Sequence, residues 1–443
     1  MSIEEELRAE IAQLKQQLAE KDKIISELQK VVAIYVSPHI PSSKKIIKEK
    51  KTDEEDKELP KKRGAPEGHL GATREVPEPD QIIYLKPEKC VNKKCNSKKI
   101  KILKEYKKIV EDVEIKKTAT EFHFFDCECQ GCGKRFTTTS KDLPKKGIFG
   151  PNITSLWSSL HYLGTIPFDR LSKVSRYLLH MDITPAALHN IAYRNAKIFK
   201  PRFEKRKKRI AKSRYVRSDE SSYSVNGDRW YLWNLSDGKN VAVLIRKSRG
   251  SKVLKEIFGE FFNGILNSDC FSAYAKFKAK EYQKCWAHIL RDAKDLAKCS
   301  DEGKELYKLL SEMYNYIVDT KEKKLENSSK IKKWIRKQKN NIDSWLDKNY
   351  DSRAVLNLVL RISKYKNDWF TCLKYPFVEP TNNASERDIR KNVIARKISG
   401  LHRSQLGINS REIMMSEILT AQHRNENPFE IIQNEIEKYN LGY

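Results

Sequence analysis

The chain has 443 residues, enough for about three domains, and its 87 Lys and Arg against 59 Asp and Glu give a net charge of +28. Its 7 Trp, 19 Tyr and 16 Phe exclude a fully disordered chain, because so many aromatic side chains need a core. A mean hydropathy of −0.70 and the lack of a long apolar run argue against a membrane protein. The acidic start, MSIEEELRAE, has no apolar export signal, so we expect a cytoplasmic location. The basic excess favours a nucleic-acid partner over a membrane surface, although a Lys-rich composition can also serve solubility alone.

Residues 1–36 carry a heptad pattern that predicts a coiled-coil helix of the leucine-zipper type. The apolar core positions are occupied by Leu7, Ile11, Leu14, Leu18, Ile25, Leu28 and Val32. Lys21 interrupts the pattern, which spans about four heptads, the threshold for a dimerising coiled coil. We therefore expect a homodimer or a larger assembly; the alternative is an amphipathic helix packed on its own chain.

Residues 37–80 are rich in Lys, Pro, Gly and acids, which predicts a basic flexible linker. This linker either follows a phosphate backbone or is a solvated tether.

Five of the nine cysteines lie in residues 81–147, which we predict to be a zinc-ribbon domain. Two cysteines separated by two residues can bind one tetrahedral ion, and a following glycine permits a tight turn. The segment between the two cysteine pairs alternates as paired strands do. The predicted ligands of a structural Zn²⁺ are Cys90, Cys95, Cys129 and Cys132. Cys127 is an alternative to Cys129 as the third ligand, and reduced structural thiols are the competing interpretation.

Residues 148–212 predict a helical DNA-binding domain. FDRLSKVSRYL, LHMDIT and PAALHNIAYRNAK indicate a helix, a turn and a second helix, with Thr184 as the cap and Pro185 at the first helical position. Such a pair can place its second helix in a major groove, but helix pairs are also common in protein cores. Residues 197–214 contain ten Lys or Arg and one Glu, which suits a phosphate-contacting arm as well as a solvated helix face. The candidate contacts are Lys205, Arg206, Lys207, Lys208 and Arg209.

Residues 213–299 change to a strand pattern. We expect strands over 214–225, 228–235 and 240–248, separated by NG and DG turns, and then a helix. A short strand ending in Asp269, a helix over 271–280, a strand over 282–288 and a helix over 289–298 follow. This order is that of a ribonuclease-H-like mixed sheet. The predicted fold class is therefore multidomain α/β, with this catalytic core following the coiled coil, zinc ribbon and helical domain.

Two acids stand at the expected edge of this sheet. Asp219 lies in the first strand and Asp269 ends the fourth, and these strands would be neighbours. A third carboxylate, Glu386, opens a helix in PTNNASERDIRKNVIARKISG within a second part of the core, residues 377–443. The long separation predicts a helical insertion over 300–376. Acids at strand ends often only cap turns, and Glu220 should point to the opposite face of the strand. Three convergent carboxylates would suit a pair of Mg²⁺ ions.

Further motifs extend the pattern along the chain. They are PSSKK, KKRGAPEGHLGATR, GIFGPNITSLWSSLHYLGTIPFDRLSKV, SDESSYSVNGDRWYLWNL, LNSDCFSAY, CWAHILRD, the PTNNASER helix and TAQHRNENPFEII. With them, the whole chain resembles the insertion-sequence-66 family of DDE transposases. The resemblance implies a catalytic triad of Asp219, Asp269 and Glu386 that holds two Mg²⁺ or Mn²⁺ ions. The other matched motif positions, predicted as DNA contacts, are His288, Arg291, Arg390, Arg396 and Lys397.

This chain departs from the family pattern in the four-residue spacing of its first cysteine pair, in Ser385 and in GLHRS, but no triad carboxylate is lost. The resemblance implies a nucleoid-associated enzyme that cuts and joins DNA at the ends of its own element, with the element ends, target DNA and possible accessory proteins as partners. The absence of GxxxxGK[ST] agrees with a reaction that needs no ATP. Two alternatives stay open: a non-catalytic DNA-binding regulator and a metal-dependent nuclease that cleaves without joining.

Overall fold

The computed structural model describes residues 16–18, 21, 77–92, 94–95, 97–326, 328–399 and 402–441. It divides into two units, Met1–Glu111 and Asp112–Tyr443. In the first unit, residues 16–18 and 21 are helical, and the described residues from 77 to 111 form neither helix nor strand. The rest of the predicted zipper, and the predicted linker up to residue 76, lie outside the described residues. None of the described helices is long and apolar enough to cross a membrane.

The second unit begins with a small antiparallel hairpin of β1 (Asp126–Glu128) and β2 (Arg135–Thr137), in which Cys127 lies opposite Phe136. Gly133 turns the chain with φ +69°, as the sequence predicts. The paired strands expected upstream do not form, and residues 112–125 are extended and exposed. Alternation alone does not make a strand, because a strand needs a partner edge and a face to bury.

Three helices follow: α2 (Pro151–Tyr162), α3 (Phe168–Leu179) and α4 (Pro185–Ala211). Thr184 caps α4 as predicted, since its side chain accepts a hydrogen bond from the backbone N–H of Ala187. Helix α4 continues for 27 residues, through Pro201. The basic run of residues 197–214 therefore forms the second half of α4, its C-cap Lys212 and the two residues after it. It is not a separate arm. Trp157, Leu171 and Leu188 form a buried cluster among these helices.

The central sheet of this unit is mixed and has the order β5-β4-β3-β6-β7. Its strands are β3 (Tyr215–Val225), β4 (Asp228–Ser236), β5 (Val241–Arg246), β6 (Phe261–Ser268) and β7 (Lys278–Lys284). The first three strands are antiparallel, whereas β6 is parallel to both β3 and β7. Asn226 and Gly227, with φ +50° and +88°, make the predicted tight turn between β3 and β4. The mixed α/β prediction is confirmed.

Two boundaries differ from the sequence prediction. The helix expected over 271–280 shrinks to α6 (Ser272–Ala275), and the strand after it begins at Lys278. Helix α7 (Trp286–Leu296) begins in the segment expected to finish that strand. The sequence KAKEYQK does not indicate a strand clearly, because β7 is exposed at its start and buried only at its end. Apolar and polar residues therefore alternate only weakly along it.

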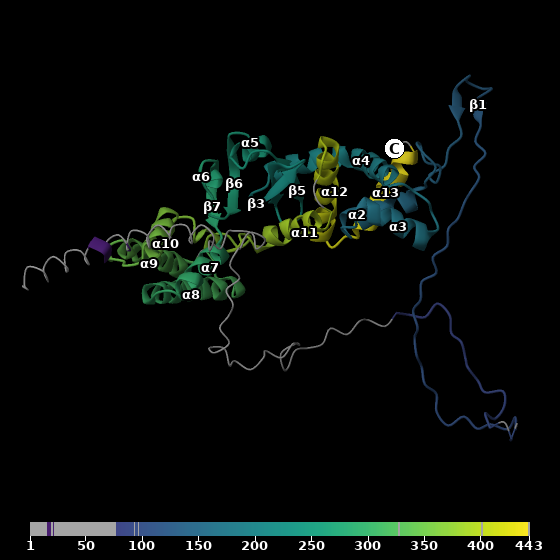
Figure 1. Cartoon of the computed structure of the whole chain (residues 1–443), viewed down its shortest axis with the longest axis horizontal. Coiled ribbons are helices and arrows are strands. Elements are labelled where there is room, and N and C mark those ends of the chain that lie inside the picture. The colour runs from purple at the N-terminus through teal and green to yellow at the C-terminus, as the bar shows by residue number, and fades with distance from the viewer. Residues whose placement is uncertain are drawn as a thin grey trace, which may run out of the picture. The chain divides into compact units, whose positions relative to one another are not determined.

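Helices cover the sheet and extend from it (Figure 1). The remaining helices of the core are α5 (Lys252–Phe258), α11 (Asn383–Ser399), α12 (Gln405–His423) and α13 (Pro428–Leu441). The segment between α7 and α11 folds into α8 (Asp301–Glu322), α9 (Ser329–Trp345), α10 (Arg353–Lys364) and the short 3-10 helix η2 (Thr371–Leu373). A second apolar core, which includes Trp286, Leu310, Val359 and Phe370, joins these helices to α7.

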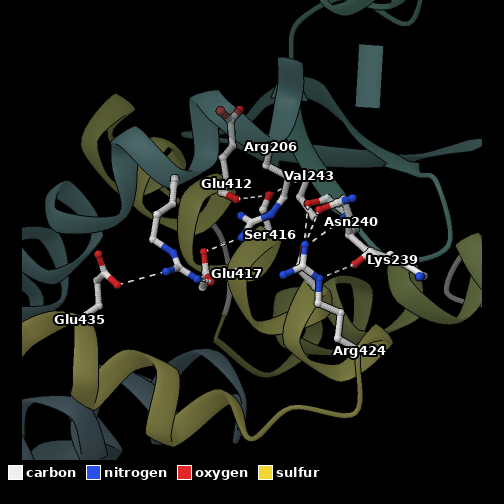
Figure 2. Close-up of polar contacts among 12 residues, drawn as sticks. Arg206, Lys239, Asn240, Val243, Glu412, Ser416, Glu417, Arg424 and Glu435 are labelled. Atoms are coloured by element: carbon white, nitrogen blue, oxygen red, sulfur yellow. Dashed lines mark hydrogen bonds and ion pairs between the residues drawn. The ribbon is translucent and has the colours of Figure 1, made fainter. Parts of the chain in front are cut away.

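Helix α12 lies beside β5 and supplies hydrogen-bond acceptors to the free edge of that strand. The backbone N–H of Val243 donates to Ser416 Oγ at 2.8 Å, and that of Ile245 donates to Glu412 Oε1 at 2.6 Å. Figure 2 shows Glu412 and Ser416 in this arrangement. Thr420 continues the row by accepting from the N–H of Val241 at 3.0 Å. Residues four apart on a helix share one face, so a single polar row of α12 satisfies the strand edge.

The opposite edge of the sheet is covered by the chain around η2. The backbone N–H of Lys284 donates to the carbonyl of Asp368 at 3.0 Å. The hydroxyl of Thr371 donates to the carbonyl of Tyr282 at 2.6 Å. Side chains of α12 therefore pair three outward amides of β5, and the chain around η2 pairs backbone groups at the end of β7.

Candidate active site

The strand register brings two of the predicted acids together. In the parallel pair β3 and β6, Arg217 lies beside Asn267. Two residues further on, the same register puts Asp219 beside Asp269, at the point where β6 ends and β3 continues. The 50-residue separation of the two acids is thus the offset between the two strands. Paired residues of neighbouring strands point the same way, so continuing this register by two residues would direct both side chains to one face of the sheet.

Glu386 lies in the first turn of α11, and hydrogen bonds hold the start of that helix to the sheet. The side-chain amide of Asn382, which is fully buried, donates to the carbonyl of Ser218 at 2.8 Å. The backbone N–H of Glu386 in turn donates to the carbonyl of Asn382 at 3.2 Å. Glu386 therefore lies one helical turn from Asn382, and Asn382 is hydrogen-bonded to the backbone of Ser218, the residue before Asp219.

A second buried amide fixes the chain that leads into α11. Asn267 on β6 donates from Nδ2 to the carbonyl of Glu379 at 2.9 Å and to that of Thr381 at 3.2 Å. Neither this role nor the bond from Asn382 to β3 follows from the sequence prediction. The available signal was an asparagine inside the apolar strand GILNSD, since a buried amide needs partners.

The charges of the predicted acids act on one another. Burial raises the pKa of Asp219 well above its ordinary value, and the negative charges of Glu220, Asp269 and Glu386 raise it further. Burial and then Asp269 also raise the pKa of Glu220. A group of mutually repelling carboxylates in a partly buried place has chemistry that suits a hard divalent cation, which prefers oxygen ligands.

Glu220 has partners of its own. Its Oε2 accepts from the hydroxyl of Tyr274 at 2.5 Å, and its Oε1 accepts from Arg249 Nη2 at 3.0 Å. These contacts occupy both carboxylate oxygens of a side chain that is almost completely buried. Glu220 therefore serves packing on the other face of the strand, as the alternation of β3 predicts.

Helix α7 presents two basic side chains to Glu386. His288 Nδ1 lies 3.6 Å from Glu386 Oε1, and Arg291 Nη2 lies 3.7 Å from Oε2. Cys285, at the start of α7, completes a group in which one donor atom each of Cys285, His288 and Glu386 lies within 4.8 Å of the others. Among the described residues this is the one group of at least three such ligand atoms that lie this close together, and the carboxylate oxygens of Asp219, Asp269 and Glu386 do not all approach one another to that distance. The buried Sγ of Cys285 already accepts from the backbone N–H of Asn382 at 3.1 Å.

Lys284 is a site-supporting residue that the sequence prediction missed. Its side chain is almost wholly buried at the end of β7, and its Nζ donates to Ser268 Oγ at 3.1 Å and to the carbonyl of Asp269 at 2.9 Å. Burial lowers the pKa of Lys284. The ammonium holds the backbone of Asp269 in place from the neighbouring strand. A lysine next to the apolar end of YQKCW was the available signal.

The structure corrects the expected role of Arg206. Its side chain is buried, and its Nη2 lies 2.6 Å from Glu417 Oε2, so no surface is left for a phosphate contact. Arg202 binds the other oxygen of Glu417 at 2.8 Å and Glu435 at 3.1 Å. Figure 2 shows Arg206, Glu417 and Glu435 in this region. The helical period explains the difference, because a basic run along a packed helix must turn some of its side chains inward.

The other predicted DNA contacts lie at the surface or close to it. Lys205, Lys208, Arg209, Arg390 and Lys397 are exposed. Lys207 is half-buried and pairs with Glu204 at 2.8 Å. Arg396 donates to the carbonyl of Ser222 on β3. Their binding to DNA stays a prediction.

The predicted zinc ligands fall into both units. Cys90 and Cys95 belong to the first unit, and Cys127, Cys129 and Cys132 belong to the β1–β2 hairpin of the second. Backbone N–H groups of Cys132 and Gly131 lower the pKa of the Cys129 thiol. The N–H of Gly133 donates to the carbonyl of Cys129 at 2.8 Å and closes the turn. Amides directed at a thiolate favour Cys129 over Cys127 as a ligand, and the zinc site itself stays a prediction.

The model of the transposase IS66 family matches residues 146–410 of the chain, which is more than half of its length. The match covers the helices α2 to α4, the whole mixed sheet and the helices that follow it as far as α11, which contains Glu386, and it ends within the first turns of α12. No curated protein matches the chain.

Proposed function

Because the chain belongs to the IS66 family of transposases, we propose that it is a DNA transposase that cleaves and joins DNA strands at a centre formed by Asp219, Asp269 and Glu386. The strongest support is the arrangement of these acids: strand register sets Asp219 beside Asp269, and Asn382 ties the helix of Glu386 to β3. The strand order and directions also support a ribonuclease-H-like core. DNA is the implied substrate and partner.

The three carboxylates would hold divalent ions, Mg²⁺ or Mn²⁺, since their mutual repulsion is relieved by positive charge. Such ions activate a water or a 3′-hydroxyl for in-line attack on a phosphodiester and stabilise the leaving oxygen. The protein's own part is positioning. Lys284 holds the backbone of Asp269, and His288 and Arg291 lie against Glu386.

Further elements of the proposal concern binding and assembly. The exposed cations of α4 would contact phosphates of the element ends, and the cysteine domain would carry a structural Zn²⁺. The heptads near the N-terminus would pair two protomers, so that two DNA ends are held in one complex. Nucleoid association follows from DNA binding in this proposal.

The test is a strand-transfer assay with the full chain and labelled duplexes from both ends of the DNA segment that encodes it. With Mg²⁺ or Mn²⁺ we expect cleaved ends and joined products, and neither without a divalent ion. Asp219→Asn, Asp269→Asn and Glu386→Gln should abolish both products and leave the fold unchanged. Asp295→Asn is the matched control, because this exposed acid of α7 pairs only with Lys298 on the surface.

Each alternative predicts its own outcome. Cleavage without joined product would identify a nuclease. DNA binding with neither product in any metal would identify a regulator. Joining that survives all three carboxylate changes would overturn the assignment of the catalytic residues.

A further inference from the structure

Helix α9 carries a row of cations along one side. Lys332, Lys333, Arg336 and Lys337 are all exposed and follow the helical spacing of three and four residues. Ser329 and Asn340 extend the same face, which carries no acid between them. The one acid of α9, Asp343, follows Asn340 by three residues and pairs with Lys366 at 2.6 Å. Pairs four residues apart are separated by about 6 Å along the helix axis. We call Lys332, Lys333, Arg336 and Lys337 the α9 row.

The opposite side of α9 fixes the direction in which the α9 row points. Ile331, Ile342 and Trp345 are buried. Trp334 stacks on Tyr316 of α8 with ring centroids 4.1 Å apart and meets Phe370 edge-on at 5.7 Å. Because one side is held by aromatic packing, the α9 row is presented outward by a packed helix rather than by a mobile tail.

The charges of the insertion are segregated. Helix α9 holds six cations and one acid, a net charge of +5, whereas the neighbouring α8 holds three cations and six acids, a net charge of −3. A general excess of lysine would raise the charge of both helices. The difference in net charge between α8 and α9 instead shows that the positive charge is concentrated on α9.

The α9 row is also free of ion pairs. Within the part of the chain that the structure describes, no salt bridge includes any of its four members, although many exposed lysines elsewhere have acidic partners. Lys304 pairs with Asp301 at 2.8 Å, and Lys323 pairs with Asp319 at 2.6 Å. Four unpaired, adjacent cations repel one another, and a polyanion relieves that repulsion.

We propose that the α9 row is a binding site for the phosphate backbone of duplex DNA, which makes the helical insertion a DNA-binding element in addition to α4. The inference rests on the proposed function for its choice of partner. In this proposal the row contacts phosphates, which hold the duplex in place and carry no sequence information directly.

The test measures binding of a fluorescent duplex of arbitrary sequence by anisotropy, in buffer without divalent cations, at several salt concentrations. The test variant changes all four members of the α9 row to Gln. The control variant loses the same charge through Lys173→Gln, Lys298→Gln, Lys304→Gln and Lys323→Gln, all exposed lysines that pair with acids three or four residues earlier. Circular dichroism and thermal unfolding compare the folding of both variants with the wild type.

We expect the row variant to bind about tenfold or more weakly, with a salt slope that is shallower by about 3 to 4, since each phosphate contact contributes roughly 0.9. The control variant should keep nearly the wild-type affinity and slope. If the two variants weaken binding equally, only net charge matters and the site is refuted.

Failure of this site is distinguishable from failure of the proposed function. If the wild type binds DNA and performs strand transfer while the row variant binds equally well, the site alone is wrong. If the wild type does not bind DNA at all, both proposals fall. Loss of binding by Asp269→Asn would not be expected, because binding without divalent cations does not need the carboxylates.

Discussion

Replacing Arg206 by Ala separates a structural role from a DNA-binding role in the basic half of α4. The change removes the partner at 2.6 Å from Glu417, whose side chain is only 3% exposed. Burial tends to raise the pKa of Glu417, but Arg206 and Arg202 outweigh it and hold that pKa below its ordinary value. A buried ion that loses one partner typically costs 3–5 kcal/mol, and because Arg202 stays we expect about 3 kcal/mol of lost stability.

The assay is thermal or urea unfolding of the full chain, read at the transition that includes this unit. A loss of about 3 kcal/mol corresponds to a fall in Tm of roughly 4 °C for a unit of this size. Lys205→Ala, next to it on the exposed side of α4, is the matched control and should change stability by less than about 0.5 kcal/mol. Adding Glu417→Gln to Arg206→Ala should restore part of the loss, because the carboxylate no longer needs a buried partner.

The opposite pattern would refute this reasoning. If Arg206→Ala unfolds like Lys205→Ala but binds DNA much more weakly, Arg206 contacts phosphate and its burial against Glu417 does not hold in solution. If the double variant is no more stable than Arg206→Ala, the two side chains are not coupled.

Two further predictions concern stability. Burial lowers the pKa of His161 to about 4, whereas the unfolded chain takes up a proton near pH 6.5, so the unfolded state binds more protons between these values. The free energy of unfolding should therefore be at its full value above pH 6.5 and fall by about 3 kcal/mol as the pH is lowered to 4. If a His161→Gln variant keeps the whole wild-type dependence of this free energy on pH in urea unfolding, the prediction is wrong. Ser416→Ala leaves the buried N–H of Val243 without its acceptor and should lower the free energy of unfolding by about 1–3 kcal/mol in the same assay. The Val243 amide should also become less protected from hydrogen exchange. The control variant Ser399→Ala, at the end of α11, should leave that protection unchanged.

Local signals in the sequence predicted much of the fold because they act over a few residues. The Asn226-Gly227 turn requires positive φ at two successive positions, and Thr184 with Pro185 starts a helix by capping and by fixed φ. The strand pattern indicated most of the strands in the same way, whereas the register that brings β6 beside β3 joins segments 50 residues apart and is not a local signal.

Other features depend on partners far away in the chain, and the local pattern does not specify them. The inward turn of Arg206 requires Glu417, which is 211 residues distant. The same holds for the bond between Asn382 and Ser218 and for the burial of Lys284 beside Asp269, where polar residues enter the interior because a distant segment satisfies them. The strands expected before Cys127 do not form among the described residues, because an alternating pattern does not by itself supply a partner strand.

Backbone groups on both edge strands of the mixed sheet are already hydrogen-bonded, and this limits how copies of this protein can associate through the sheet. Glu412, Ser416 and Thr420 occupy the outward amides of β5, and Asp368 and Thr371 occupy backbone groups of β7. A strand from a neighbouring molecule could add at these positions only by breaking the hydrogen bonds to α12 or to the chain around η2. Contacts between copies at these two places would therefore use helix and side-chain surfaces rather than an extended sheet.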